Sequence, residues 1–417
     1  MRKAARFGLF VMVLVMVLSS AVVAEKTKLV WATCCSQTER HTLFKELAKQ
    51  YMDQHPDIEI EWIYPTGNYT NNIMTWIVAG TAPDVFWIGA SVYSFYNLLM
   101  PLNDLVAKDP DIALINPMVL AQGAFAGRQI CLPFGANAHT MFYNKDLLGT
   151  AGLGNPGWNW TFDDMVTMAR RLQRDLNGDG EPDQYGIDFN TIEWSAILWG
   201  GNYYTDDGRK AQFANPVSIA STQLFVDLRN GVIPGYVPPT KRQANGSLTG
   251  QVAMRNVGIF DLPAHRQATF NWDIQRLPAF VYDGKEYRFT YNTIEGWSIP
   301  GNTKHPEEAK AFLAWLFSKE VRQQIAASRI VIPTQRDVVD RFINAPAPPS
   351  NWNAFIDALN WGNQLSLNHP DGTSIHNWMT SQKLWKDMWA NAVPAAVALP
   401  EIQTGVNQLL DEFWARN

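Results

Sequence analysis

The sequence predicts an α/β protein with two lobes, on three observations. Residues 28–88 alternate between strand-like and helix-like patterns, an order typical of a largely parallel sheet covered by helices on both faces. The chain has 417 residues, which is enough for two domains of ordinary size. It contains no internal repeat and no long low-complexity linker. We therefore expect the two lobes to be joined by short connections, and the chain to pass between the lobes more than once.

The N-terminal segment has the layout of a secretory signal peptide. Three basic side chains precede an apolar stretch from Phe7 to Val23, and we expect cleavage after about Ala24, which makes residues 1–24 the signal peptide. The alternative is a single membrane anchor, but the stretch is shorter than the ~20 residues that usually span a bilayer. We therefore expect a mature protein that is periplasmic or secreted.

The first elements of the mature chain follow in a regular order. Apolar spacing predicts a buried strand at 28–33, a helix at 37–55, a strand at 58–64, a helix at 69–79 and a buried strand at 82–88. Gly80 is expected to end the second helix. In such sheets ligands lie at the carboxyl ends of the strands, so the loops after Trp31, Tyr64 and Trp87 are expected to face a ligand.

A second region begins near Asn137. Its apolar patterns predict helices at 162–172, where Thr161 is the N-cap, at 216–228 and at 307–317. They also predict a short extended segment at 331–334, a proline-rich break at 345–350 and an aromatic, helical tail at 352–414.

Composition narrows the class of ligand. Without the three basic side chains of the signal segment, the net charge changes from −5 to −8. A mildly acidic surface argues against nucleic acid, whose partners need basic patches. The 17 tryptophans suggest aromatic platforms for a ligand. A tryptophan-rich core with a tryptophan-rich terminal helix is the alternative.

The three cysteines are Cys34, Cys35 and Cys131. In an oxidising compartment one pair could close and leave one thiol free. A bridge between the adjacent pair would be strained, and a bridge to Cys131 requires a proximity that the sequence does not show. No histidine or basic cluster stands beside them to activate a thiolate, so nucleophilic catalysis is not expected.

Seven short segments resemble one known family when they are taken in order. The segments are Ala79–Trp87, Leu98–Val106, Gly127–Phe134 followed by Met141–Leu147, Trp160–Asp164, Val252–Met254 with Gly258, Lys304–Phe317 and Ile332–Arg336. They are similar to the patterns of the bacterial extracellular solute-binding proteins that serve sugar-type ABC transporters, the relatives of maltose-binding protein. The resemblance covers about residues 28–340.

The resemblance implies a type II-like periplasmic-binding-protein fold, with a ligand cleft between two α/β lobes that close by a hinge. Lobe 1 would hold residues 25–135 and about 291–340, and lobe 2 would hold residues 136–290 and about 341–417. The implied function is capture of a mono- or oligosaccharide and its delivery to a membrane-embedded ABC permease. We expect a monomer that performs no chemistry on its ligand.

The candidate ligand-binding residues come from two arguments. Strand-end positions and the crossing near residue 136 point to Glu39, Asn68, Trp87, Asn137 and His139. The resemblance adds Phe260, Asp261, Glu295, Trp297 and Arg336. Aromatic planes suit the C–H face of a sugar, and polar side chains suit its hydroxyls. Each residue could instead be structural. Trp158 and Trp160 are core or cleft-lip residues, and Trp361 is a further candidate platform.

Two other functions stay open. A peptide, amino acid derivative or polyol would also fit this class of protein, and a carboxylate ligand would favour Arg336 or Arg255 in the cleft. A secreted carbohydrate-active enzyme is the less favoured alternative, because the sequence contains no phosphate loop, HExxH, Gly-x-Ser-x-Gly or paired-cysteine zinc motif.

One acidic loop has the spacing of a calcium site. The candidate ligands are Asp175, Asn177, Asp179, Glu181 and Asp183. Position 12 of the pattern is Gly186 instead of glutamate, so either Asp188 completes the shell or the loop is only an acidic turn. No cofactor is required, and calcium, if bound, would be structural.

Overall fold

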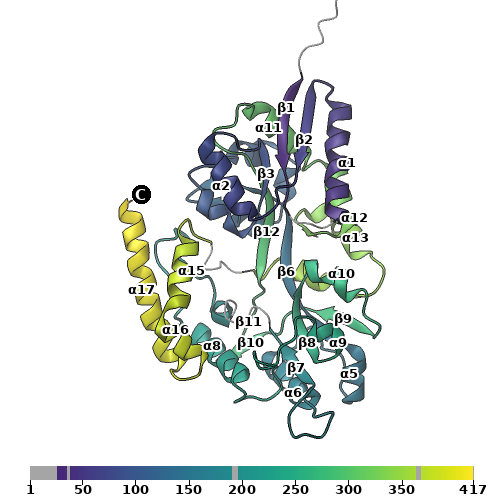
Figure 1. Ribbon diagram of the computed structural model, residues 1–417, viewed down its shortest axis with the longest axis vertical. Coiled ribbons are helices and arrows are strands. Elements are labelled where there is room, and N and C mark those ends of the chain that lie inside the picture. The colour runs from purple at the N-terminus through teal and green to yellow at the C-terminus, as the bar shows by residue number, and fades with distance from the viewer. Residues whose placement is uncertain (1–25, 35–37, 190–195, 363–367, 417) are drawn as a thin grey trace, which may run out of the picture.

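The computed structural model describes residues 26–34, 38–189, 196–362 and 368–416. The predicted signal peptide lies outside these residues. Figure 1 shows an upper lobe that carries β1, β2 and β3 and a lower lobe that carries β7 to β11. The long strand β6 and the strand β12 lie between them, which is the two-lobed α/β arrangement that the sequence predicts.

The upper lobe begins with the predicted order of elements. These are β1 (Thr27–Ala32), α1 (Thr38–Gln54), β2 (Ile58–Ile63), α2 (Tyr69–Ala79) and β3 (Val85–Ile88). Strand β1 pairs in parallel with both β2 and β3, so the carboxyl ends of the three strands share one edge. Gly80 ends α2 at a φ of 71°, a conformation that glycine adopts without steric cost. These predictions are confirmed to within a few residues.

The rest of the upper lobe is helical apart from three very short strands. In chain order its elements are η1 (Ala90–Phe95), α3 (Asn103–Lys108), η2 (Ile112–Leu114), α4 (Pro117–Ala121), β4 (Ala124–Phe125), β5 (Arg128–Gln129), α11 (Pro306–Trp315), α12 (Lys319–Ser328), β13 (Ile332–Pro333), η5 (Arg336–Val338) and α13 (Val339–Ile343).

One sheet runs through both lobes. Its order is β2-β1-β3-β12-β6-β8-β7, and β13 and β9 also pair with β6. Strand β6 (Leu132–Asn144) pairs with β12 (Asn292–Ser298) up to Ala138 and with β8 (Val252–Gly258) from His139 onward. The strand therefore changes partners between Ala138 and His139 as it passes from one lobe to the other.

The lower lobe has the predicted amphipathic helix at α6 (Phe162–Leu172), with a capping box between Thr161 and Asp164. Its other elements are α5 (Lys145–Thr150), β7 (Tyr185–Asp188), η3 (Ala196–Gly200), α8 (Pro216–Arg229), α9 (Gly246–Thr249), η4 (Ile259–Asp261), α10 (Leu262–His265), β9 (Trp272–Gln275), β10 (Phe280–Tyr282) and β11 (Lys285–Tyr287). Strands β7 and β8 run parallel, so their carboxyl ends also share an edge.

The C-terminal segment is helical, as predicted. It contains α14 (Asn353–Ala358), α15 (Gly372–Ser381), α16 (Lys383–Trp389) and α17 (Ala395–Arg416). In Figure 1 the last three helices are yellow and flank the lower lobe, and the C-terminal end of α17 rises beside the upper lobe. The predicted residue boundaries of the two lobes stay a prediction.

Tryptophans are divided between the core and other positions. Trp31 and Trp297 lie in a cluster formed by the first strands, α1 and α11. Trp199 lies in the cluster of the lower lobe, and Trp352 lies in a cluster that includes residues of both lobes.

Within the described part of the chain, every helix is too short or too polar to cross a membrane.

Candidate functional site

A polar network lies where β3, β12 and β6 meet. Glu295 is 4% exposed and forms an ion pair with Arg40 of α1, which is 2% exposed. Trp87 donates its indole N–H to Glu295 Oε2 at 3.1 Å, and Asn137 donates its amide N–H to Glu295 Oε1 at 2.6 Å. Three predicted site residues from distant parts of the sequence are therefore in direct contact.

Trp87 also borders a small hollow at the carboxyl end of β3, which is too narrow in this conformation to admit a water molecule. The hollow is lined in part by Tyr69, Thr70 and Ser91. The rings of Tyr69 and Trp87 meet edge to face, with centroids 5.5 Å apart. Trp87 therefore lies at the strand end that the sequence predicts, and its contact with a ligand stays a prediction.

His139 lies two residues beyond Asn137 on β6, so both side chains project from the same face of the strand. Its Nδ1 is 3.0 Å from the amide nitrogen of Asn256, and burial lowers the pKa of His139 to about 3. The ring is therefore neutral, with the proton on Nε2, which has no hydrogen-bond partner among the described residues. Phe260 is 47% exposed and meets His139 edge to face at 5.8 Å.

Asp261 supports the turn that carries Phe260. Its Oδ2 accepts the backbone N–H of Gly258 at 2.9 Å. Burial raises the pKa of Asp261, although this hydrogen bond and the nearby side chains of His265 and Arg255 partly lower it. The described contacts make Asp261 a support for the aromatic ring beside it.

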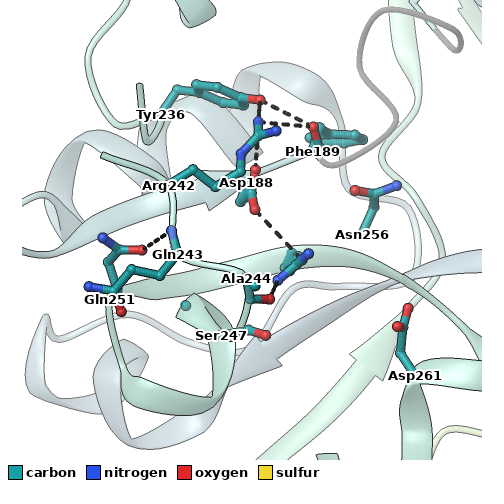
Figure 2. Close-up of polar contacts among 12 residues, drawn as sticks. Asp188, Phe189, Tyr236, Arg242, Gln243, Ala244, Ser247, Gln251, Asn256 and Asp261 are labelled. Carbon is teal, nitrogen blue, oxygen red and sulfur yellow. Dashed lines mark hydrogen bonds and ion pairs between the residues drawn. The ribbon is translucent and has the colours of Figure 1, made fainter. Parts of the chain in front are cut away.

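A second charged cluster lies at the shared edge of β7 and β8 (Figure 2). Asp188 is 1% exposed and faces Arg242 at 2.9 Å and Arg255 at 3.6 Å. Arg255 also donates to the carbonyl of Ala244 at 2.8 Å, and Arg242 donates to the hydroxyl of Tyr236. Burial raises the pKa of Asp188, and the two guanidinium groups oppose that shift. Both arginines are thus held by groups of the protein.

Three predicted site residues lie on the surface. Glu39 is exposed in the first turn of α1, and Arg336 is exposed at the start of η5. Asn68 is the N-cap of α2, and its side chain accepts the N–H of Asn71 at 3.0 Å. The contacts that the structure records do not join these residues to either cluster.

The structure contradicts the predicted role of Trp297 as a ligand platform. It is 0% exposed, stacks on Phe134 at 4.6 Å and meets Trp31 edge to face at 5.1 Å. A ring with no exposed face is a core residue, so its assignment as a ligand platform is wrong for this conformation. Trp160 is buried as well, whereas Trp158 and Trp361 are exposed.

Arg40 and Arg242 were missed by the sequence reasoning. Arg40 follows the first predicted strand by only a few residues, but helical spacing alone does not distinguish a buried arginine from an exposed one. Arg242 lies outside every predicted element. Only their contacts with Glu295 and Asp188 reveal their roles.

The acidic loop is closed by its own hydrogen bonds, and its occupation by calcium stays a prediction. Asp175 accepts the N–H groups of Gly178 at 2.7 Å and Gly180 at 2.8 Å, and these hydrogen bonds lower the pKa of Asp175. The loop's other carboxylates bond within the loop in the same way, except Glu181, which pairs with Lys241 at 3.1 Å. Among the described residues no three His, Cys, Asp or Glu side chains are gathered as a metal site.

The cysteines divide into two kinds. Cys34 is disulfide-bonded. Cys131 is a free, buried thiol, and burial raises its pKa to about 12. A bridge to Cys131 is therefore excluded, and Cys35 lies outside the described residues.

Two α/β lobes that share long strands, with aromatic and polar groups gathered where those strands pass between the lobes, define a two-lobed solute-binding protein. A family model described as "Bacterial extracellular solute-binding protein" matches residues 36–323. The chain belongs to this family.

Individual relatives agree with that assignment. A maltotriose-binding protein of Pyrococcus abyssi is 26% identical over 312 residues, which cover 72% of this chain and 64% of the relative. A mannitol-binding protein of Pseudomonas aeruginosa is 24% identical over 310 residues, which cover 68% of this chain and 67% of the relative. The structure of an ABC substrate-binding protein from Listeria monocytogenes in complex with cycloalternan matches with a TM-score of 0.76 and 19% identity, over 93% of this chain and 100% of that chain.

Proposed function

We propose that this protein captures an uncharged carbohydrate as the substrate-binding component of an ABC transporter and delivers it to a membrane-embedded permease. The observation that carries the proposal is that the buried charges are paired with one another, both in the Glu295 network and in the Asp188 cluster. Arg40 is paired with Glu295, and Arg242 and Arg255 are paired with Asp188. A charged ligand would have to compete for groups that are already neutralised inside the protein.

The groups that we assign to the ligand are neutral. They are the partly exposed aromatic rings of Trp87 and Phe260, and two buried atoms that have no hydrogen-bond partner among the described residues, the amide oxygen of Asn137 and Nε2 of His139. Aromatic faces suit the C–H surface of a sugar ring, and a hydrogen-bond donor beside an acceptor suits hydroxyl groups. The printed names of three relatives support this chemistry, since maltotriose, mannitol and cycloalternan are uncharged, whereas a fourth relative is named for the anion sn-glycerol 3-phosphate.

A carboxylate-bearing solute is the second candidate that the sequence left open. Arg336 or Arg255 was its expected partner. Arg255 faces Asp188 and the carbonyl of Ala244 instead, and Arg336 lies on the surface outside both charged clusters. An enzyme is disfavoured by the family. A hydrogen-bonded pair of Ser247 and His265 does occur at 3.1 Å, but the other ring nitrogen of His265 lies 2.9 Å from the backbone carbonyl of Asp261 rather than from a carboxylate, so the pair lacks the third group of a catalytic triad.

The test is a thermal-shift screen of the mature protein, without residues 1–24. The panel contains maltotriose, mannitol and tagatose as neutral probes, and glutamate and glycerol 3-phosphate as charged probes. A ligand at a hundred times its Kd adds about 2.7 kcal/mol to the free energy of unfolding. We expect a rise in Tm with at least one neutral probe, no rise with either charged probe, and no product after long incubation.

Phe260→Ala should abolish that shift and change the Tm of the free protein little, because about half of the side chain is exposed. Tyr282→Ala is the matched control. Tyr282 is also an exposed aromatic residue, but it lies on the β10–β11 hairpin, whereas Phe260 lies in η4. A shift with the charged probes only would overturn the carbohydrate assignment. Turnover of any probe would overturn the binding role.

We also propose that the protein is periplasmic or secreted after cleavage at about Ala24. The extracellular family supports this location. The intact mass of the exported chain checks the cleavage position.

A further inference from the structure

Glu295 is the centre of the network in the upper lobe. It lies on β12 at a β-bulge, where the register against β6 shifts between Glu295 and Gly296. Arg40 donates to both carboxylate oxygens, and its Nη2 is 3.1 Å from Oε1. With the bonds from Trp87 and Asn137, the carboxylate accepts four hydrogen bonds, two at each oxygen.

Those four bonds use the whole acceptor capacity of the group. An ionised carboxylate has about four lone-pair sites and no proton to donate. Glu295 is also almost fully buried, and its charge is balanced by an equally buried guanidinium. A ligand hydroxyl would therefore find no free acceptor on Glu295, although the sequence had suggested a direct contact.

The hydrogen bonds to Glu295 determine the orientation of two other side chains. Because the indole N–H of Trp87 is directed at Oε2, the orientation of its ring beside the Tyr69 hollow is fixed. Because the amide N–H of Asn137 is directed at Oε1, its amide oxygen is turned away, and that oxygen has no partner among the described residues. A neutral amide at position 295 could not accept all four bonds.

We infer that Glu295, held by Arg40, is a positioning residue that orients the Trp87 ring and the Asn137 amide for the ligand without touching it. This inference rests on the proposed carbohydrate-binding function. It has a consequence in the ligand-free protein, so it can be tested separately from that function.

The first experiment records the indole N–H signals of the ¹⁵N-labelled, ligand-free protein by NMR. Trp87→Phe assigns the Trp87 signal. In Glu295→Gln we expect this signal to shift upfield and its exchange with water to accelerate, because a charge-assisted hydrogen bond is lost. Asp337→Asn is the matched control, since Asp337 pairs with the buried Arg322 elsewhere in the upper lobe and should leave the Trp87 signal unmoved. An unchanged Trp87 signal in Glu295→Gln would overturn the inference.

The second experiment measures maltotriose affinity by calorimetry in a mutant cycle. Glu295→Gln should weaken binding about tenfold in the wild-type background. In a background that carries Trp87→Phe and Asn137→Ala, it should weaken binding less than about twofold, because the side chains through which it acts are gone. Equal effects in the two backgrounds would mean that Glu295 contacts the ligand directly and would overturn the inference. Failure of the wild type to bind maltotriose would count against the proposed function for this sugar, while the NMR experiment would still decide the role of Glu295.

Discussion

Single residues near the site show how burial determines chemistry. Trp87 and Trp297 are partners in the register of β3 and β12, yet one borders a hollow and the other is enclosed by Phe134 and Trp31. Residue type alone does not separate these two tryptophans. The packing of the strand into the sheet does, because it decides which ring is enclosed and which is partly exposed.

The burial of His139 also makes the stability of the folded protein sensitive to acid. Its pKa is lowered from 6.5 to about 3 because the protonated ring would lose its hydration. The unfolded chain therefore binds the proton more tightly than the folded one between these two values, and stability falls as pH drops below about 6.5. His369, with a pKa lowered by burial to about 4, acts in the same direction.

The test at this scale compares wild type with His139→Gln by urea unfolding at pH 7.5 and pH 5. At pH 5 a shift of this size corresponds to about 2 kcal/mol of lost unfolding free energy. The loss between the two pH values should be smaller in the variant by an amount of this order. Identical losses in the two proteins would show that His139 does not account for acid sensitivity.

At the scale of elements, helix ends and strand order explain most of the local structure. Thr161 and Asp164 close a capping box at the start of α6, and Gly80 ends α2. The acidic loop is also a local element, because Asp175 binds the N–H groups of residues three and five positions later. Such a loop can close without a cation.

The prediction for this loop concerns calcium. We expect Tm to be the same with calcium and with a chelator, since the loop's oxygens already accept its own N–H groups. Asp175→Ala should lower Tm equally under both conditions, because it removes those two bonds. Ser381→Ala, outside the loop, is the control substitution. A rise in Tm with calcium that disappears in Asp175→Ala would show that the loop does hold the ion.

At the scale of the whole molecule, the lobes also meet away from the shared strands. Phe125, on the hairpin of β4 and β5 in the upper lobe, stacks on Trp414 at 6.1 Å and meets His369 edge to face at 5.7 Å. Trp414 lies at the end of α17, whose earlier turns pack into the core of the lower lobe. This contact restrains the relative orientation of the lobes.

Phe125→Ala should therefore broaden the distribution of distances between the lobes. The measurement is a pulsed electron spin resonance distance between labels at Val78 on α2 and Val397 on α17, two exposed positions. Phe280→Ala is the matched control, because Phe280 is buried to a similar degree but lies within the core of the lower lobe. Equal broadening in the two variants would mean that the Phe125 contact does not hold the lobes together.

The sequence by itself determined the α/β class, the order of the first five elements, the Thr161 cap and the helical tail. Apolar periodicity and capping act over a few residues, so they can be read locally. Strand-end reasoning also identified Trp87, and the crossing identified Asn137 and His139 as neighbours. Only the tertiary structure paired Arg40 with Glu295 and Arg242 with Asp188, and buried Trp297. These contacts join segments up to 255 residues apart, and desolvation and ion pairing depend on what the folded chain brings together, which no local pattern encodes.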